Sequence, residues 1–385
     1  MTDKPFAEVV LNVPLDKKFH YRIPPEFAQV IGVGQRVKVS FGKRVMAGYC
    51  VGFADKAEVA EVKDILDVLD NTPMVDEAML RLTRWMADYY CCGWGEALEA
   101  VLPGGVRRRS APKMKTIVEL AKPREELATV VESLRATSLK QTRMLQVLIE
   151  HKDEITPRDL ARLAGGSISS VRSLLRAGHV RFTRKKVESD EAPLLMDETP
   201  VEKTAPLTPT PEQAYALKVI GEKLSQGGFG VVLLHGVTGS GKTEVYLQAI
   251  AQTIALGKQA IVLIPEISLT PQTVRRFMSR FDRVGVLHSG LTDGQRNVQW
   301  QRIRAGETDV VVGARSAVFA PMPRLGLVVV DEEHEPSFKQ DNAPRYHGRD
   351  VAVMRAHMLG ALVVLGSATP SLESYHNACS GKYFG

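Results

Sequence analysis

A glycine-rich segment with a lysine and a threonine, GVTGSGKT, occupies residues 236–243. Its spacing, G-x-x-x-x-G-K-[ST], follows the apolar run 231–235, which is where a strand would give way to a helix. Glycines let consecutive N–H groups face a phosphate, and the following helix adds its positive N-terminus. We therefore expect a nucleotide site in which Lys242 contacts the terminal phosphates and Thr243 holds Mg²⁺. An accidental glycine-rich turn is the alternative for the string alone. The expected cradle is Gly236, Val237, Thr238, Gly239, Ser240, Gly241, Lys242 and Thr243.

Two further apolar runs end in polar groups. DEEH at 331–334 follows one run, so Asp331 is placed to bind the Mg²⁺ shell and Glu332 to orient an attacking water. We count His334 with these catalytic residues; a solvated helix cap is the alternative for DEEH alone. GSATP at 366–370 follows the other run and brings Ser367 and Thr369. Ligands bind at the carboxyl ends of parallel strands, so we expect the three segments to converge on one nucleotide.

The order GSGKT, DEEH, SAT resembles the first RecA-like lobe of superfamily 2 helicases. Longer strings, among them GVTGSGKTEVY, DEEHEPSFKQ, RYHGRD and GSATPS, resemble the PriA family of replication-restart helicases from about residue 5 to the end. The resemblance implies a 3′→5′ DNA helicase that uses ATP and Mg²⁺ and recognises abandoned forks. It also implies as partners forked and single-stranded DNA, primosome and helicase-loading proteins, and single-stranded DNA-binding protein.

The family also has a second lobe and paired C-x₂-C zinc motifs farther along, so this chain looks like an N-terminal part. The zinc ligands are then expected outside it, since its four cysteines form no C-x₂-C pair. The arginines that assist hydrolysis normally come from the second lobe, so we expect weak nucleotide binding and little hydrolysis from these 385 residues alone.

Length and composition are those of a multi-domain soluble protein. A chain of 385 residues predicts two or three domains, and 44% hydrophobic with 24% charged residues is ordinary for globular proteins. No apolar stretch approaches the ~18 residues of a membrane helix, and the start lacks a signal region, so we expect a cytoplasmic protein without a membrane partner. The net charge of +6 agrees with a polyanionic partner.

Residues 1–105 are expected to form a small β-rich, barrel-like domain. Alternating patterns predict strands at 6–11, 18–22, 36–40 and 47–51, followed by a helix at 83–90. The resemblance makes this domain the one that binds the 3′ end of a nascent strand. At the position of His20, the family commonly has an acid. Phe19 could instead be a core aromatic, and Lys63 could be a solvated cation. The implied pocket residues are Phe19, His20, Gly42 and Lys63.

Residues 113–187 are expected to form an α/β winged helix. Helices are predicted at 138–151, 159–163 and 167–175, and a basic wing at 180–187. Arg172 and Arg176 on the third helix suit duplex phosphates, although a winged helix used for protein contact is the alternative. The acidic, proline-rich stretch 188–206 is expected to be a mobile linker.

Residues 207–385 are expected to be a RecA-like α/β lobe with a parallel sheet. Gln213 resembles the adenine-reading glutamine of helicases, and Arg315 is either a DNA contact or a salt-bridge residue. The segment 335–347 resembles the aromatic-rich loop of PriA and RecQ-type helicases. We expect Phe338, Lys339, Arg345 and Tyr346 to couple DNA binding to ATP turnover, although an aromatic core plug is the alternative. Ser367 and Thr369 should link the ATP state to the grip on DNA. Two alternatives remain for the function of the whole chain: a non-catalytic fork-binding scaffold, and another superfamily 2 translocase.

Overall fold

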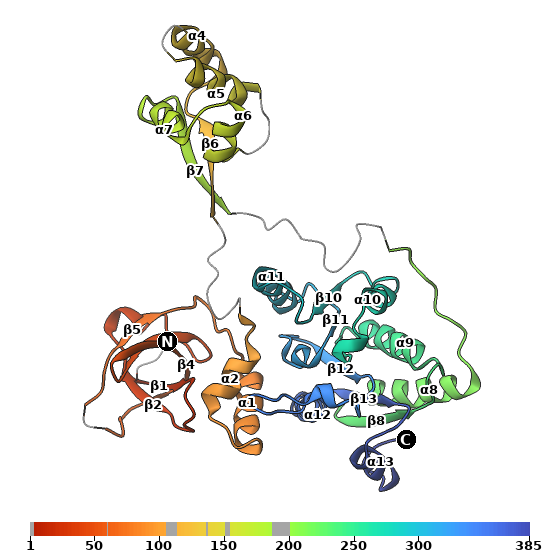
Figure 1. Cartoon of the computed structure of the whole chain (residues 1–385). Coiled ribbons are helices and arrows are strands. Elements are labelled where there is room, and N and C mark those ends of the chain that lie inside the picture. The colour runs from red at the N-terminus through yellow and green to blue at the C-terminus, as the bar shows by residue number, and fades with distance from the viewer. Residues whose placement is uncertain (1–3, 60, 105–113, 136–137, 151–154, 187–200) are drawn as a thin grey trace. The chain divides into compact units, whose positions relative to one another are not determined.

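The computed structural model describes residues 4–59, 61–104, 114–135, 138–150, 155–186 and 201–385. The chain divides into two compact units (Figure 1). The first unit joins residues 1–108 with 193–385, and the second unit is 109–192. Of the expected linker, residues 188–200 lie outside the described part.

The N-terminal part of the first unit is a five-stranded antiparallel sheet in the order β2-β1-β4-β3-β5. The four predicted strands are found as β1 to β4, and β5 was not predicted. Asp76 caps the helix that follows, its carboxylate accepting from the amide of Met79 at 2.7 Å. Apolar side chains from several of these strands enclose one core. The elements are β1 Phe6–Leu11, β2 Phe19–Arg22, η1 Pro25–Phe27, β3 Arg36–Phe41, β4 Arg44–Ala54, β5 Ile65–Val68, α1 Glu77–Tyr89 and α2 Trp94–Val101.

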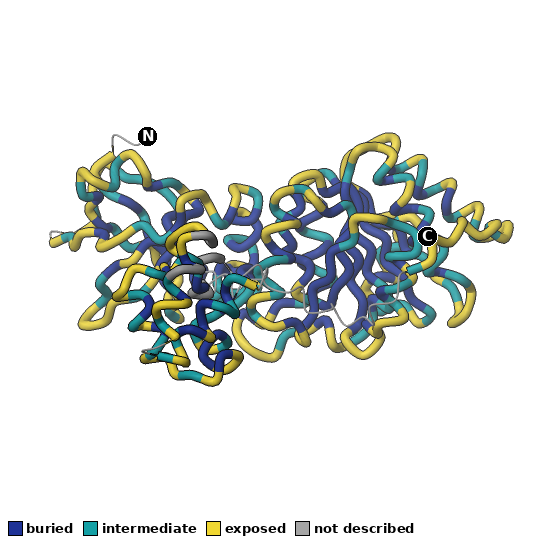
Figure 2. The backbone as a smooth tube through the Cα atoms, turned by 90° about the horizontal axis from the view of Figure 1, so that it is seen from above, coloured by how far each residue is buried: buried dark blue, intermediate teal, exposed yellow. Residues whose placement is uncertain are grey.

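The C-terminal part of the first unit is a six-stranded sheet in the order β10-β11-β9-β12-β13-β8, with every neighbouring pair parallel. Its strands are near-continuous apolar runs because helices cover both faces, and they form the dark band in Figure 2. This confirms the predicted parallel α/β lobe. The strands are β8 Gly230–His235, β9 Gln259–Leu263, β10 Val284–Leu287, β11 Val310–Gly313, β12 Leu325–Val330 and β13 Leu362–Ser367. The helices are α8 Pro211–Gln226, α9 Lys242–Ala255, η2 Glu266–Ser268, α10 Pro271–Met278, α11 Asp293–Arg304, η3 Arg315–Phe319, η4 Pro336–Phe338, α12 Gly348–Leu359 and α13 Leu372–Cys379.

Helices α1 and α2 join the two parts of the first unit. Their apolar side chains share one buried cluster with residues of the parallel sheet and of α12. The backbone N–H of His347 donates to the hydroxyl of Tyr90 at 3.1 Å, and Arg304 donates to the hydroxyl of Thr72 at 3.0 Å. The N-terminal sheet is therefore anchored to the lobe by packed helices, which the sequence did not indicate.

The second unit combines helices with a two-stranded antiparallel sheet of β6 and β7, as in a winged helix. Thr156 caps α6 by accepting from the amide of Asp159, and Ser167 caps α7. Its core contains Met144 and Leu174, both fully buried. Strand β6 and helix α4 were not predicted. The elements are β6 Met114–Leu120, α4 Arg124–Arg135, α5 Leu139–Glu150, α6 Pro157–Leu163, α7 Ile168–Arg176 and β7 Val180–Lys186.

Candidate nucleotide and DNA sites

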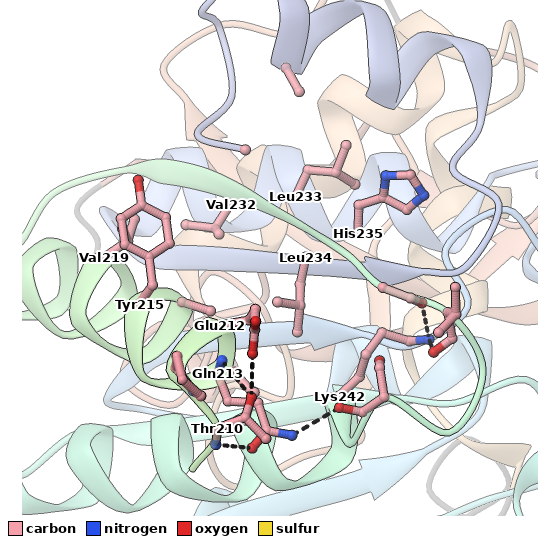
Figure 3. Close-up of a pocket in the computed structure, with 18 of the residues that line it drawn as sticks. Thr210, Glu212, Gln213, Tyr215, Val219, Val232, Leu233, Leu234, His235 and Lys242 are labelled. Atoms are coloured by element: carbon pink, nitrogen blue, oxygen red, sulfur yellow. Dashed lines mark hydrogen bonds between the residues drawn. The ribbon is translucent and has the colours of Figure 1, made fainter.

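The glycine-rich loop lies between β8 and α9, at the carboxyl end of the parallel sheet. Gly239 and Gly241 have φ of 82° and 80°, a left-handed conformation that favours glycine, and Gly241 is the N-cap of α9. The buried side chain of Lys242 folds back over the loop, and its Nζ donates to the carbonyl of Gly236 at 2.8 Å (Figure 3). Lys242 Nζ also lies 3.7 Å from Glu332 Oε1. The loop thus brings its cation to the acidic segment.

Asp331 directly follows β12, and its backbone N–H donates to the carbonyl of Leu263 on β9 at 2.9 Å. Its Oδ1 accepts from the hydroxyl of Tyr246 on α9 at 3.0 Å. Burial raises the pKa of Asp331, and the tyrosine hydroxyl and Lys242 oppose that shift. Glu332 has φ of 44°, which is uncommon for a residue other than glycine. The backbone therefore turns sharply at the second acid of DEEH.

Glu333 is itself fully buried, and its carboxylate lies in a polar cluster. Its carboxylate pairs with Arg349 of α12 at 2.8 Å and accepts from the N–H of Ser371 at 2.7 Å and the hydroxyl of Ser374 at 3.0 Å. Burial alone would raise its pKa, but Arg349 and these donors outweigh burial and lower the pKa of Glu333. The acid therefore holds DEEH to the start of α13.

His334 joins DEEH to the end of β13. Its Nδ1 lies 2.7 Å from Ser367 Oγ, and its Nε2 lies 3.3 Å from Thr369 Oγ1. Glu332 Oε2 lies 3.7 Å from the same Nδ1. The structure thus brings together four of the residues singled out from sequence.

Two clefts flank the glycine-rich loop. One, of about 590 Å³, contains Lys242, Thr243, Asp331 and Glu332. Its remaining wall comes from residues 204–207, the loop, and the side chains of α9 and α10, including the unpredicted Arg276. The other, of about 1050 Å³, is bounded by α8, β8 and α13 and appears in Figure 3.

Gln213 lines the larger cleft, and its side-chain amide is already engaged in hydrogen bonds. Its Oε1 accepts from the N–H of Thr210 at 3.0 Å, and its Nε2 donates to the carbonyl of Ser240 at 2.8 Å. Thr210 and Gln213 form a capping box at the start of α8. To read adenine, the amide would have to exchange these bonds for bonds to the base.

The 590 Å³ cleft suits a Mg²⁺-bound nucleoside triphosphate. Thr243 supplies a hydroxyl and Asp331 a carboxylate on the same wall, and both are oxygen donors of the type Mg²⁺ prefers. Among the described residues, no three histidine, cysteine or acidic side chains are grouped to hold a metal, so zinc ligands are not found there.

The aromatic-rich segment 335–347 differs from the sequence expectation in one respect. Phe338 and Tyr346 are each 1% exposed, so neither offers a free face for stacking on a base in this conformation. Their rings pack beneath the loop, beside a 220 Å³ hollow at the ends of β9 and β11. Lys339 and Arg345 are exposed, as a DNA contact requires.

Arg315 tethers this loop and forms no ion pair among the residues that the structure describes. Its guanidinium donates to the carbonyls of Ser337 and Lys339 and lies 5.7 Å from the ring centre of Tyr346. These bonds are not a salt bridge, and the DNA contact stays a prediction.

The four residues of the expected 3′-end pocket line one hollow of about 180 Å³ on the N-terminal sheet. Phe19 and His20 are half-buried, and the Phe19 ring packs edge-on against Phe41 at 5.1 Å. The Nζ of Lys63 donates to the carbonyl of Gly42 at 3.2 Å. The hollow therefore combines an aromatic edge, an imidazole and an exposed cation.

On the second unit, Arg172 and Arg176 lie four residues apart on α7, and both side chains are exposed. Of the basic wing, Arg181 is exposed and pairs with Glu119 at 3.0 Å, while the side chains of residues 184–186 lie outside the described part. This face remains a prediction for DNA.

Sequence reasoning missed Tyr246 and the pair Glu333–Arg349. Tyr246 lies four residues after Lys242, a spacing that places both on one side of a helix and could have indicated it. No local signal joins Glu333 to Arg349, since they meet only through the fold.

The sheet and the motifs at its edge define the lobe of a helicase: residues 210–378 match the family model "DEAD/DEAH box helicase". Residues 8–103 match the model "3′DNA-binding domain (3′BD)" of PriA. The replication restart protein PriA of Bacillus subtilis (strain 168) is 35% identical over 445 residues, covering 98% of this chain and 55% of the relative. The PriA of Haemophilus influenzae is 39% identical over 384 residues, covering 98% of this chain and 51% of the relative.

The chain is similar to these PriA proteins over 98% of its length. It spans about half the length of the curated relatives it matches. A solved structure of RecG bound to a three-way DNA junction is similar at a TM-score of 0.36 and 25% identity, over 47% of this chain and 25% of that one. No described helix is long and apolar enough to cross a membrane.

Proposed function

We propose that this chain carries the nucleotide-binding and DNA-binding parts of an ATP-dependent 3′→5′ DNA helicase that acts in replication restart. The observation that carries the proposal is the grouping of Lys242, Asp331 and Glu332 in one cleft, with His334 bonded to Ser367 beside it. The match to the helicase family model and the similarity to PriA proteins support the same activity.

In this proposal, each residue acts on bound ATP from its place in the cleft. Lys242 exchanges the carbonyl of Gly236 for phosphate oxygens, and the N–H groups of residues 238–243 surround the anion. Bound Mg²⁺ would neutralise developing charge on the phosphates. Thr243 and Asp331 would hold that ion, and Glu332 would orient the attacking water.

We propose that DNA is bound at three places. The hollow lined by Phe19, His20, Gly42 and Lys63 would take the 3′ end of a nascent strand, with the aromatic edge against the base and Lys63 near phosphate. Arg172 and Arg176 would contact duplex phosphates. The lobe would hold single-stranded DNA near Arg315, Lys339 and Arg345.

Because Phe338 and Tyr346 are buried, DNA binding would have to be coupled to ATP turnover in a different way from direct stacking on these rings. We propose that DNA first meets Lys339 and Arg345 and competes for the bonds that Arg315 gives to the loop. Release of the loop would then expose the aromatic rings and shift the neighbouring DEEH segment. Ser367 and Thr369 would pass the same change to β13 through His334.

The division of labour follows the segments: 1–105 for the 3′ end, 113–187 for duplex DNA, 188–206 as linker and 207–385 as the ATP-binding lobe. Primosome and helicase-loading proteins and single-stranded DNA-binding protein are proposed partners in the cytoplasm. Arginines contributed by a second lobe would complete hydrolysis, so these residues alone should hydrolyse little ATP.

The test uses the complete protein and forked DNA. ATP hydrolysis should rise when DNA is added, and a duplex with a 3′ single-stranded tail should be unwound in preference to one with a 5′ tail. Fork binding without any DNA-stimulated hydrolysis would instead favour a scaffold, and hydrolysis with translocation but no unwinding would favour another superfamily 2 translocase.

A further inference from the structure

Tyr246 occupies a position between the phosphate-binding loop and the acidic segment. It lies on α9, four residues after Lys242, so its side chain leaves the same side of the helix one turn later. The residue is 1% exposed, and its hydroxyl donates to Asp331 Oδ1 at 3.0 Å. One helix therefore carries the phosphate-binding lysine at its start and a direct contact to the candidate Mg²⁺ ligand one turn on.

The segment GSATP also packs closely against the hydroxyl of Tyr246. A Cβ added to Gly366, at the end of β13, would lie 1.6 Å from the Tyr246 oxygen, so a side chain there is incompatible with the tyrosine as placed. The carbonyl of Gly366 accepts from the N–H of Glu333 at 3.0 Å. The tyrosine hydroxyl thus sits where α9, DEEH and GSATP meet.

We infer that Tyr246 is a positioning residue that fixes the Asp331 carboxylate for Mg²⁺-bound nucleotide; this rests on the proposed function. The carboxylate has two side-chain torsions and lies at the end of a strand, so a donor on one oxygen fixes the direction of the other. Hydrogen-bond partners of metal-binding side chains commonly set metal affinity in this way. The contact is made through α9, so it also fixes the distance between the phosphate-binding loop and the acid.

Tyr246→Phe tests the assignment because it removes one oxygen and keeps the ring that fills the core. In the complete protein, binding of a fluorescent ATP analogue is titrated with Mg²⁺ and is measured again in EDTA. We expect the Mg²⁺ concentration at half-saturation to rise about tenfold, with binding in EDTA unchanged.

Tyr49→Phe is the matched control. Tyr49 is also buried and also donates to a carboxylate, Glu99 Oε2, at 3.0 Å, but it lies on the N-terminal sheet. Each variant loses the same kind of bond, so both should lower the melting temperature by similar amounts. The Mg²⁺ shift should appear in Tyr246→Phe alone.

Three results would overturn the assignment. A Mg²⁺ titration of Tyr246→Phe equal to that of the wild type would show that the hydroxyl does not position Asp331. An equal loss of binding in EDTA would assign Tyr246 a general structural role. If the wild-type protein itself showed no nucleotide binding, the proposed function would fail first, and this assignment with it.

Discussion

His334 Nδ1 lies 2.7 Å from Ser367 Oγ, so the last residue of DEEH is bonded to the first hydroxyl of GSATP. These residues are 33 positions apart in sequence and come from the ends of two neighbouring parallel strands, β12 and β13. Thr369 approaches the other nitrogen of the same ring at 3.3 Å. A movement of either strand end therefore reaches the other through one imidazole.

His334→Ala should uncouple DNA from ATP turnover in the complete protein. ATP binding is expected to persist, because Lys242 and Thr243 are untouched, while DNA-stimulated hydrolysis falls roughly tenfold, the equivalent of one lost hydrogen bond. Steady-state ATPase with and without single-stranded DNA measures the effect. His376→Ala on the exposed face of α13 serves as control, and equal rates in both variants would contradict this role for His334.

Glu333 should make stability depend on pH. Its folded-state pKa is lowered from the ordinary value of 4.5, so its contribution is fully present above about pH 4.5 and is lost as the pH falls through the lower folded-state value. Glu333→Gln should lose about 3 kcal/mol of stability at pH 7, where Arg349 is left without its buried partner.

Urea unfolding of the variant, measured between pH 7 and pH 3, should accordingly show a smaller loss on acidification than the wild type. Glu373→Gln, which removes an exposed carboxylate in the first turn of α13, should retain the wild-type profile. Parallel profiles for wild type and Glu333→Gln would refute the buried ion pair.

Arg315→Gln should loosen the loop that carries the buried aromatics. Loss of its bonds to Ser337 and Lys339 is expected to increase hydrogen exchange at Gln340 and Tyr346 by about tenfold, since their amide bonds lie within the loop. Arg345→Gln is the control, because its Nε donates to the carbonyl of Asp341 in the same loop.

A second variant tests the role of the segment 335–347 in coupling by removing one of its buried rings. Phe338→Ala should cost about 3–5 kcal/mol because the ring is fully buried. If the folded fraction of that variant kept normal DNA-stimulated ATPase in the complete protein, coupling through the loop would be wrong.

Lys63→Ala should weaken recognition of a 3′ end and leave folding intact, because the side chain is exposed. Affinity for a fork with a free 3′-hydroxyl at the leading strand is expected to fall about tenfold, which corresponds to one charge-assisted contact. Fluorescence anisotropy compares this fork with one whose 3′ end is blocked by phosphate.

Lys38→Ala, which removes an exposed lysine of β3 outside the hollow, should bind both forks as the wild type does. A matching loss in the two lysine variants would assign Lys63 to general electrostatic attraction.

The convergence of the three segments at one edge of the sheet was predictable because their signals are local. The run before GVTGSGKT, the acids after β12 and the hydroxyls after β13 each mark a strand end, and parallel strands bring such ends to one edge. The capping box of Thr210 and Gln213 was also readable, as T-x-x-Q, but the interpretation of Gln213 as an adenine contact did not use that pattern.

What could not be predicted depends on tertiary packing. An aromatic residue in a polar loop can stack on DNA or fill a core, and residue type alone did not place Phe338 in the core or Tyr346 beneath Arg315. Helix α2 is short and begins at a glycine cap, so it gave too little periodicity to detect. The anchoring of the N-terminal sheet by Tyr90 and Arg304 joins segments more than 200 positions apart.

The most direct test of the central claim is Lys242→Ala in the complete protein, with ATP hydrolysis and fork binding measured on the same preparation. The variant should lose DNA-stimulated hydrolysis and unwinding, because it removes the lysine that lies over the glycine-rich loop and 3.7 Å from Glu332. Its affinity for a fork with a free 3′-hydroxyl should equal that of the wild type, since the 3′-end hollow lies on the N-terminal sheet. Retained hydrolysis, or a parallel loss of fork binding, would contradict the assignment of ATP and the 3′ end to separate sites.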